Sequence, residues 1–183
     1  MANGVGALNG FGQSPWYDNL TRTMLRDGGL ARLVAEDGIR GVTSNPTIFE
    51  KAMAAGEGYD EQLLELHGSG ASTEEAFWSL VVDDIAAAAE ILRPVYEESG
   101  ASDGYVSVEV SPRLAHDTDA TVAQARELFA RIGHPNVMIK IPATLAGLPA
   151  ITEVLAAGIN VNVTLIFDLD RYDAVLEIGR AHV

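Results

Sequence analysis

The chain has 183 residues, 48% of them hydrophobic and 21% charged, a composition typical of a soluble globular protein with a sizeable core. Twelve Lys and Arg residues against 26 Asp and Glu residues give a net charge of -14, which argues against nucleic acid and anionic membranes as partners. With no cysteine, the chain cannot form disulfides or thiolate sites. No apolar run approaches the roughly 20 residues of a membrane-spanning helix, so we expect a cytoplasmic protein.

The predicted elements alternate between strands and helices along the chain. Residues 1–13 are rich in Gly and Asn without a period, which predicts a flexible leader. Strands are predicted, in chain order, at 14–18, 38–43, 105–110, 137–141 and 159–167. Helices are predicted at 19–36 with an interruption at Gly28-Gly29, at 47–54, at 59–67, at 72–98 after a capping box from Ser72 to Glu75, at 118–132 capped by Thr118-Asp119, at 147–157 closed by Gly158, and from 168 to about 176. Because this alternation carries no hairpin signal, the sheet is expected to be parallel.

Polar side chains occur inside the predicted strands as well as in the loops. Ser107 and Glu109 alternate with valines, and Asn160, Asn162 and Thr164 alternate with apolar residues. A period of two places each polar set on one face of its strand. Because an open doubly wound sheet buries both faces under helices, this pattern favours a barrel whose reactive groups lie toward its carboxyl end.

Lys140 is the strongest candidate for a reactive group. Of the two lysines in the chain, Lys51 lies among polar helix-like residues, whereas Lys140 lies inside an apolar strand. A lysine in apolar surroundings loses hydration of its charged form, which leaves more free amine to attack a carbonyl and begin a Schiff base. The alternative is a lysine that extends to solvent or pairs with a carboxylate. Glu109 fits both interpretations, as an ion-pair partner or as a group that holds a water and moves protons.

The other polar candidates each have a structural alternative. Asp18 ends a predicted strand and could simply cap the next helix, and Asn45 before Pro46 could be a turn and cap residue. Asn160, Asn162 and Thr164 could satisfy each other inside a barrel. That all of them converge on Lys140 by accident is the weaker hypothesis.

Four motifs in chain order, together with these residues, closely resemble transaldolase. The resemblance spans Gly12 to about Leu176 and is most similar to the branch that begins Gly-Gln-Ser and contains a Trp, here Gly12-Gln13-Ser14-Pro15-Trp16. The motifs are Thr43 to Ala52 around Ser44-Asn45-Pro46, Val106-Ser107-Val108-Glu109-Val110, Ile139-Lys140-Ile141-Pro142-Ala143-Thr144, and Gly158 to Phe167 around Asn160-Val161-Asn162-Val163-Thr164.

The resemblance implies a (β/α)8 TIM barrel of the class I aldolase type that needs neither a metal nor an organic cofactor. Such enzymes act on sugar phosphates in the non-oxidative pentose phosphate pathway. They move a dihydroxyacetone unit from sedoheptulose 7-phosphate to glyceraldehyde 3-phosphate, which gives erythrose 4-phosphate and fructose 6-phosphate.

The resemblance also implies a role for each candidate residue. By motif position, Lys140 is the Schiff-base lysine and Asp18 takes the proton from the C4 hydroxyl of the donor. Glu109 and Thr164 hold the water used in imine formation and release. Asn45 and Asn162 bind the hydroxyls of the trapped three-carbon unit.

The length of the chain adds a further expectation. A closed barrel of this kind has eight strands, whereas five are predicted, so 14–177 is expected to be the N-terminal part of a barrel and inactive by itself. The phosphate-binding residues are then expected outside these 183 residues. Residues 178–183 coincide with the translation of a common sequencing adapter, which predicts a non-native tail. The sequence leaves open the oligomeric state and a fusion to a sugar-phosphate isomerase.

Two other functions remain open from the sequence. The first is an aldolase that cleaves or forms fructose 6-phosphate with the same lysine but does not transfer the fragment. The second is a catalytically silent barrel that only binds a sugar phosphate. The presence of Lys140, Asp18 and Glu109 together argues against the silent barrel.

Overall fold

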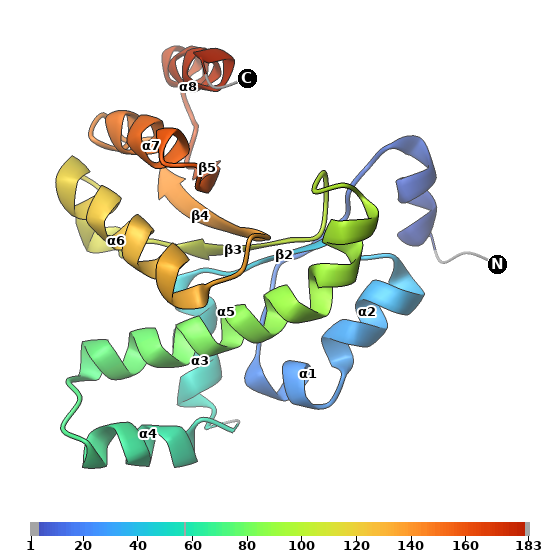
Figure 1. Ribbon diagram of the computed structural model, residues 1–183, viewed down its shortest axis with the longest axis vertical. Helices are drawn as coiled ribbons and strands as arrows, with labels where there is room; N and C mark the ends of the chain where they lie inside the picture. Colours follow the sequence, from blue (N-terminus) through green and yellow to red (C-terminus); the bar gives the residue numbers. More distant parts are fainter. Residues whose placement is uncertain (1–3, 57, 182–183) are drawn as a thin grey trace. The chain divides into compact units, whose positions relative to one another are not determined.

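Strands and helices alternate along this chain, and the strands join in one sheet (Figure 1). The computed structural model describes residues 4–56 and 58–181. The sheet has five strands in the order β1-β2-β3-β4-β5, with β1 parallel to β2 and β4 parallel to β5. The predicted α/β class and parallel sheet are confirmed, and the alternation is consistent with the first units of a TIM barrel.

The strands are β1 (Trp16–Tyr17), β2 (Gly41–Thr43), β3 (Tyr105–Glu109), β4 (Val137–Pro142) and β5 (Asn160–Thr164). The helices are η1 (Gly6–Phe11), α1 (Arg22–Arg26), α2 (Gly29–Asp37), α3 (Pro46–Ala54), α4 (Asp60–Gly68), α5 (Thr73–Glu98), η2 (Pro112–Leu114), α6 (Thr118–Ile132), α7 (Gly147–Ala156) and α8 (Leu169–Ala181), where η marks a 3-10 helix. No helix in the described part of the chain is long and apolar enough to span a bilayer.

The chain divides into two compact units. The first comprises Met1–Val106 with His134–Asn136, and the second comprises Ser107–Gly133 with Val137–Val183. The boundary falls within β3, after Val106.

The core of the first unit is built around α5, the long green helix of Figure 1, which packs against α1, α2 and α4. The predicted capping box begins this helix: the Ser72 hydroxyl accepts from the Glu75 amide, and the Glu75 carboxylate accepts from the Ser72 amide. Ile85, Ala88 and Leu92 recur at three- and four-residue spacing on one face of α5 and are fully buried. The 3.6-residue period of the sequence therefore places its apolar face in the core.

A buried polar cluster lies between α1, α4 and α5. The Arg22 Nε lies 2.7 Å from the Asp84 Oδ1, and the two residues are 4% and 2% exposed. The Tyr59 hydroxyl donates to the other Asp84 oxygen at 2.6 Å, and the Arg22 guanidinium lies over the Tyr59 ring. Arg22 also donates to the Gln62 side chain at 2.6 Å and to the Leu80 carbonyl at 3.3 Å. Burial raises the pKa of both Tyr59 and Asp84, because it penalises their charged forms.

The second unit has β4 and β5 at its centre, with α6 and α7 packed against each other and against the sheet. In β4, Val137, Ile139 and Ile141 are fully buried, whereas Met138 and Lys140 between them are not. Period-two alternation therefore directs the apolar residues of β4 into the core and leaves Lys140 on the other face.

Glycine is required where α7 begins. A Cβ on Gly147 would lie 2.0 Å from the Pro142 carbonyl oxygen, far inside van der Waals contact. The Gly147 amide donates to the Thr144 hydroxyl at 2.9 Å, and that hydroxyl donates to the Ala115 carbonyl. This close approach holds the loop after β4 against the start of α7.

Several boundaries differ from those predicted. Within the predicted leader, residues 6–11 form η1, and the Asn9 side chain donates to the Gly38 carbonyl at 2.9 Å, whereas residues 1–3 lie outside the described residues. The cap of α6 is Asp117, one residue before the predicted Thr118-Asp119, because the Asp117 carboxylate accepts from the Ala120 amide.

The region of β5 and α8 also differs from the prediction. β5 ends at Thr164 because Leu165 adopts a left-handed backbone with φ of 60°, which ends the extended conformation predicted to reach residue 167. Gly158, with φ of 78°, occupies the left-handed position expected after α7. α8 continues to Ala181, into the predicted tail at 178–183, whose last two residues lie outside the described part of the chain. The non-native origin of that tail stays a prediction.

Candidate active site

Lys140 and Glu109 lie next to each other on β4 and β3 in the second unit. The Lys140 Nζ is 3.6 Å from the Glu109 Oε2, and the side chains are 12% and 20% exposed. The backbone joins the two strands just beyond Glu109, where the Val110 amide donates to the Lys140 carbonyl at 3.2 Å. The predicted ion pair is therefore present, in a place that still has limited access to solvent.

Asn162 lies beside Lys140 on the neighbouring strand. The register of β4 and β5 pairs Lys140 with Asn162 and Pro142 with Thr164. Because paired residues of parallel strands direct their side chains to the same face, Asn162 and Lys140 share a face of the sheet. This supports the predicted face of β5 on which Asn160, Asn162 and Thr164 alternate with apolar residues.

Thr164 ends β5 with a hydroxyl that makes no hydrogen bond within the described part of the chain. Its Oγ1 is buried and has no hydrogen-bond partner among residues 4–56 and 58–181. Its carbonyl accepts from the Ala143 amide at 2.8 Å, which fixes the backbone at this position. A buried hydroxyl of this kind calls for a polar partner, such as a water or a substrate hydroxyl.

Asp18 follows β1 in the first unit and does not cap the next helix. The cap of α1 is Thr21, whose side chain accepts from the Met24 amide at 3.2 Å, so the cap alternative for Asp18 is wrong. Asp18 is exposed and accepts a hydrogen bond from the hydroxyl of Thr43 at the end of β2. Its carboxylate thus remains accessible at the carboxyl end of a strand, the usual place for reactive groups in barrels.

Asn45 follows β2 and is the N-cap of α3. Its side-chain oxygen accepts from the Ile48 amide at 3.0 Å, and Pro46 occupies the first helical position. The cap alternative for Asn45 is therefore confirmed. Because the cap uses only the oxygen, the side-chain amide nitrogen can still donate to a ligand.

The six predicted site residues thus fall in two sets. The structure brings Lys140, Glu109 and Asn162 together in the second unit, with Thr164 further along β5. Asp18 and Asn45 follow two adjacent strands of the first unit. In the described ranges, no group of three or more His, Asp or Glu residues is placed to hold a metal ion.

Sequence reasoning missed two partners of these residues. Thr43 bonds Asp18, and its position on β2, immediately before Ser44-Asn45, was the available signal. Thr144 bonds the Ala115 carbonyl and the Gly147 amide, and its position two residues after Pro142 is the corresponding signal in the loop after β4. Both threonines shape the ends of strands that carry candidate residues.

Comparison with known proteins assigns the fold and motifs to a family. A family model described as Transaldolase/Fructose-6-phosphate aldolase matches residues 15–183. The chain is 54% identical over 170 residues to "Transaldolase 1" of Streptomyces avermitilis, which covers 93% of this chain and 45% of the relative. It is also 54% identical over 177 residues to "Transaldolase" of Thermobifida fusca, covering 97% of this chain and 48% of the relative. The chain therefore spans about half the length of the curated relatives it matches.

Proposed function

The chain belongs to the transaldolase and fructose-6-phosphate aldolase family, and we propose that the native protein containing it is a transaldolase. In the proposed reaction, a dihydroxyacetone unit moves from sedoheptulose 7-phosphate to glyceraldehyde 3-phosphate. The products are erythrose 4-phosphate and fructose 6-phosphate, as in the non-oxidative pentose phosphate pathway. The names of the relatives, all given as transaldolases, support transfer to an acceptor.

The first chemical step is formation of an imine on Lys140. The neutral amine attacks the C2 carbonyl of the donor, and the carbinolamine then takes up one proton and loses one water to give the protonated imine. Glu109, at 3.6 Å from the amine, is close enough to take up and return protons through one water. The buried Thr164 hydroxyl supplies a second hydrogen-bonding group for that water.

The second step breaks the bond between C3 and C4 of the donor. Asp18 takes the proton of the C4 hydroxyl, the C3–C4 electron pair moves into the imine, and erythrose 4-phosphate leaves as an aldehyde. The remaining three-carbon enamine then attacks the aldehyde carbon of glyceraldehyde 3-phosphate. Asn45 and Asn162 hold the hydroxyls of the three-carbon unit while the acceptor replaces the first product.

The observation that carries this proposal is the arrangement around Lys140. An ion pair alone would also fit a structural lysine, but Lys140 pairs with Glu109 and in addition has Asn162 beside it in register. The same three groups are the ones that a Schiff-base mechanism requires: an amine, a proton shuttle and a hydroxyl-binding amide.

Trapping of the intermediate tests the proposal. Borohydride reduction of the native protein with fructose 6-phosphate should leave a three-carbon adduct on Lys140, located by mass spectrometry of peptides. Lys140→Arg should abolish the adduct, whereas Lys51→Arg, at the other lysine of the chain, should not. An adduct on Lys51, or none on the unaltered protein, would refute the mechanism.

The main alternative is a fructose-6-phosphate aldolase, which the description of the matched family also contains. Both enzymes form the same adduct on the lysine, so trapping does not separate them. The dependence of turnover on an acceptor does: a transaldolase releases the three-carbon unit only when an aldehyde takes it, whereas the aldolase releases free dihydroxyacetone.

We also infer the partners and location of the protein. Sugar phosphates are the proposed substrates, and the net charge of -14 disfavours nucleic acid. A cytoplasmic location is supported by the substrates, since phosphorylated sugars are charged and do not cross bilayers unaided.

A further inference from the structure

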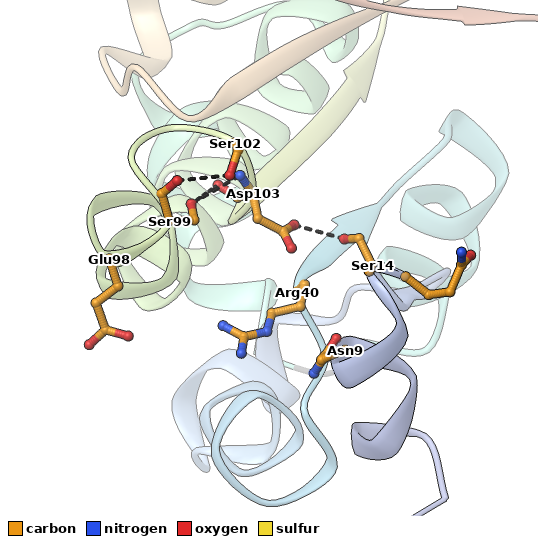
Figure 2. A pocket seen from close by; sticks show the side chains of 9 residues that line it. Asn9, Ser14, Arg40, Glu98, Ser99, Ser102 and Asp103 are labelled. Atoms are coloured by element: carbon orange, nitrogen blue, oxygen red, sulfur yellow. Dashed lines mark hydrogen bonds between the residues drawn. The ribbon is translucent and has the colours of Figure 1, made fainter.

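A polar pocket of about 480 Å³ lies at the amino ends of the first three strands (Figure 2). Ser14 precedes β1, Arg40 precedes β2 and Asp103 precedes β3, and all residues that line the pocket belong to the first unit. Asp18 and Asn45 follow β1 and β2, so the pocket is at the opposite ends of these strands from the candidate site residues. Its volume falls within the roughly 300–1,000 Å³ of pockets that bind small molecules.

Hydrogen bonds hold the walls of the pocket in place. The Arg40 amide donates to the Pro15 carbonyl at 2.8 Å, and the Arg40 carbonyl accepts from the Gly104 amide at 2.9 Å. The Ser14 hydroxyl donates to the Asp103 carboxylate at 2.8 Å, as Figure 2 shows. Because these bonds join the segments before all three strands, a ligand would meet a preformed site.

Three groups around the pocket are not used by the fold. Over residues 4–56 and 58–181, neither the Arg40 guanidinium nor the Glu98 carboxylate has an ion-pair partner. The side-chain oxygen of Asn9 is buried and has no hydrogen-bond partner in that same part of the chain. By contrast, the Asp103 carboxylate already accepts from Ser14 and from the Gly104 amide. The pocket therefore offers one cation, one anion and one neutral acceptor.

The charges of these groups select the kind of ligand. An anion could pair with Arg40 but would be repelled by Glu98 and Asp103, and a cation could pair with Glu98 but would be repelled by Arg40. A molecule with both charges satisfies both groups. Its carboxylate can accept two parallel hydrogen bonds from the Arg40 guanidinium, and its ammonium can donate to the Glu98 carboxylate.

We propose that this pocket binds a small zwitterion of the amino-acid type. Arg40 precedes β2 and Glu98 ends α5, so the two charged groups come from separate elements, and Asn9 of η1 lies on the other side of Arg40 from Glu98 (Figure 2). This site is separate from the proposed transaldolase chemistry, and its test does not depend on turnover.

A set of three matched probes tests the charge requirement. L-Serine carries both charges, ethanolamine lacks the carboxylate and glycerate lacks the ammonium. Binding of each probe to the native protein is measured by ligand-observed NMR titration. Serine should bind saturably, and the other two should bind at least about tenfold more weakly, because each leaves one charged group of the pocket unpaired. Equal binding of glycerate or ethanolamine, or no saturable binding of serine, would overturn the proposal.

Two variants locate the binding. Arg40→Gln and Glu98→Gln should each weaken serine binding about tenfold or more, since each removes one ion pair with the ligand. Both side chains lack ion-pair partners in the described chain, so these changes should leave the thermal unfolding temperature nearly unchanged. Arg32→Gln, at an exposed arginine of α2 outside the pocket, is the matched control and should bind serine normally. Unchanged serine binding in Arg40→Gln would place the ligand elsewhere and refute this site.

Discussion

The Lys140 amine and the Glu109 carboxylate, 3.6 Å apart on adjacent strands, form a pair that is neither fully buried nor fully exposed. Such a position allows the carboxylate to serve a second role besides pairing, because a water can still reach it. We therefore predict that Glu109→Gln slows formation and hydrolysis of the imine by roughly 100- to 10,000-fold. Single-turnover kinetics in the native protein would measure both steps.

The control for this prediction is Glu127→Gln, which removes a carboxylate from an exposed ion pair on α6. It should leave both imine steps unchanged. If Glu109→Gln slows them no more than Glu127→Gln does, Glu109 has only the structural role of pairing with Lys140.

Asp18 should act on a different step. Because Thr21 rather than Asp18 caps α1, Asp18→Asn removes no helix cap, and the fold should tolerate it. We expect carbon bond cleavage to slow by roughly 100- to 10,000-fold, with little change in the amount of imine trapped on Lys140. Asp119→Asn, at an exposed position of α6, is the control. Normal cleavage in Asp18→Asn would show that another group takes the proton.

The buried pair of Arg22 and Asp84 should matter for stability. Arg22→Met leaves the Asp84 carboxylate buried without its cation, which should lower the free energy of unfolding by about 3–5 kcal/mol. Arg93→Met breaks an exposed pair with Glu97 instead and should lower it by less than about 1 kcal/mol. Urea unfolding of the native protein measures both values. Equal losses in the two variants would mean that the buried pair stabilises the fold no more than the exposed pair does.

A double variant tests whether Arg22 and Asp84 stabilise the fold as a pair. Arg22→Met combined with Asp84→Leu removes both charges, so no uncompensated carboxylate stays buried. Its loss of stability should therefore be smaller than the sum of the two single losses. Additive losses would indicate that Arg22 and Asp84 act independently.

We predict that the free energy of unfolding falls in alkali because of Tyr59. Burial, with the hydrogen bond to Asp84, raises its pKa well above the ordinary value of 10.0, so the folded protein keeps a proton that the unfolded chain releases. The contribution of the protonated Tyr59 to the free energy of unfolding is complete below pH 10. It declines by about 1.4 kcal/mol per pH unit as pH rises between the pKa of Tyr59 in the unfolded chain and its pKa in the folded protein.

Tyr59→Phe tests this dependence. The variant loses its hydrogen bond to Asp84 at every pH, but it cannot release a phenolic proton, so its unfolding free energy should fall less steeply above pH 10. Tyr105, whose pKa burial also raises, accounts for part of any remaining slope. Identical slopes for Tyr59→Phe and the unaltered protein would show that Tyr59 ionises as easily in the folded state as in the unfolded one.

The isolated 183-residue chain should self-associate. Phe167 is 88% exposed, Leu169 80% and Leu165 59%, which groups three large apolar side chains around the end of β5. Sedimentation velocity should detect association that increases with concentration. Replacing the three residues by Ser should reduce it, whereas Leu64→Ser, at an exposed leucine of α4, should not. A monomer at all concentrations would contradict the prediction.

The sequence alone determined those features that depend on local patterns. Period-two alternation located β3, β4 and β5 and placed Lys140 on the face opposite Ile139 and Ile141. The capping box from Ser72 to Glu75 located the start of α5, because both partners lie within one helical turn. The motif resemblance then supplied the family without any knowledge of contacts.

Only the tertiary structure decided which distant groups meet. Arg22 and Asp84 are 62 positions apart, and no local period links a residue of α1 to one of α5. Arg40, Glu98 and Asn9 appear unremarkable in the sequence and become a candidate site only because their elements border one pocket. Local spacing fixes the face on which a side chain lies, but partners across a fold depend on how whole elements pack, which is a property of the complete set of contacts.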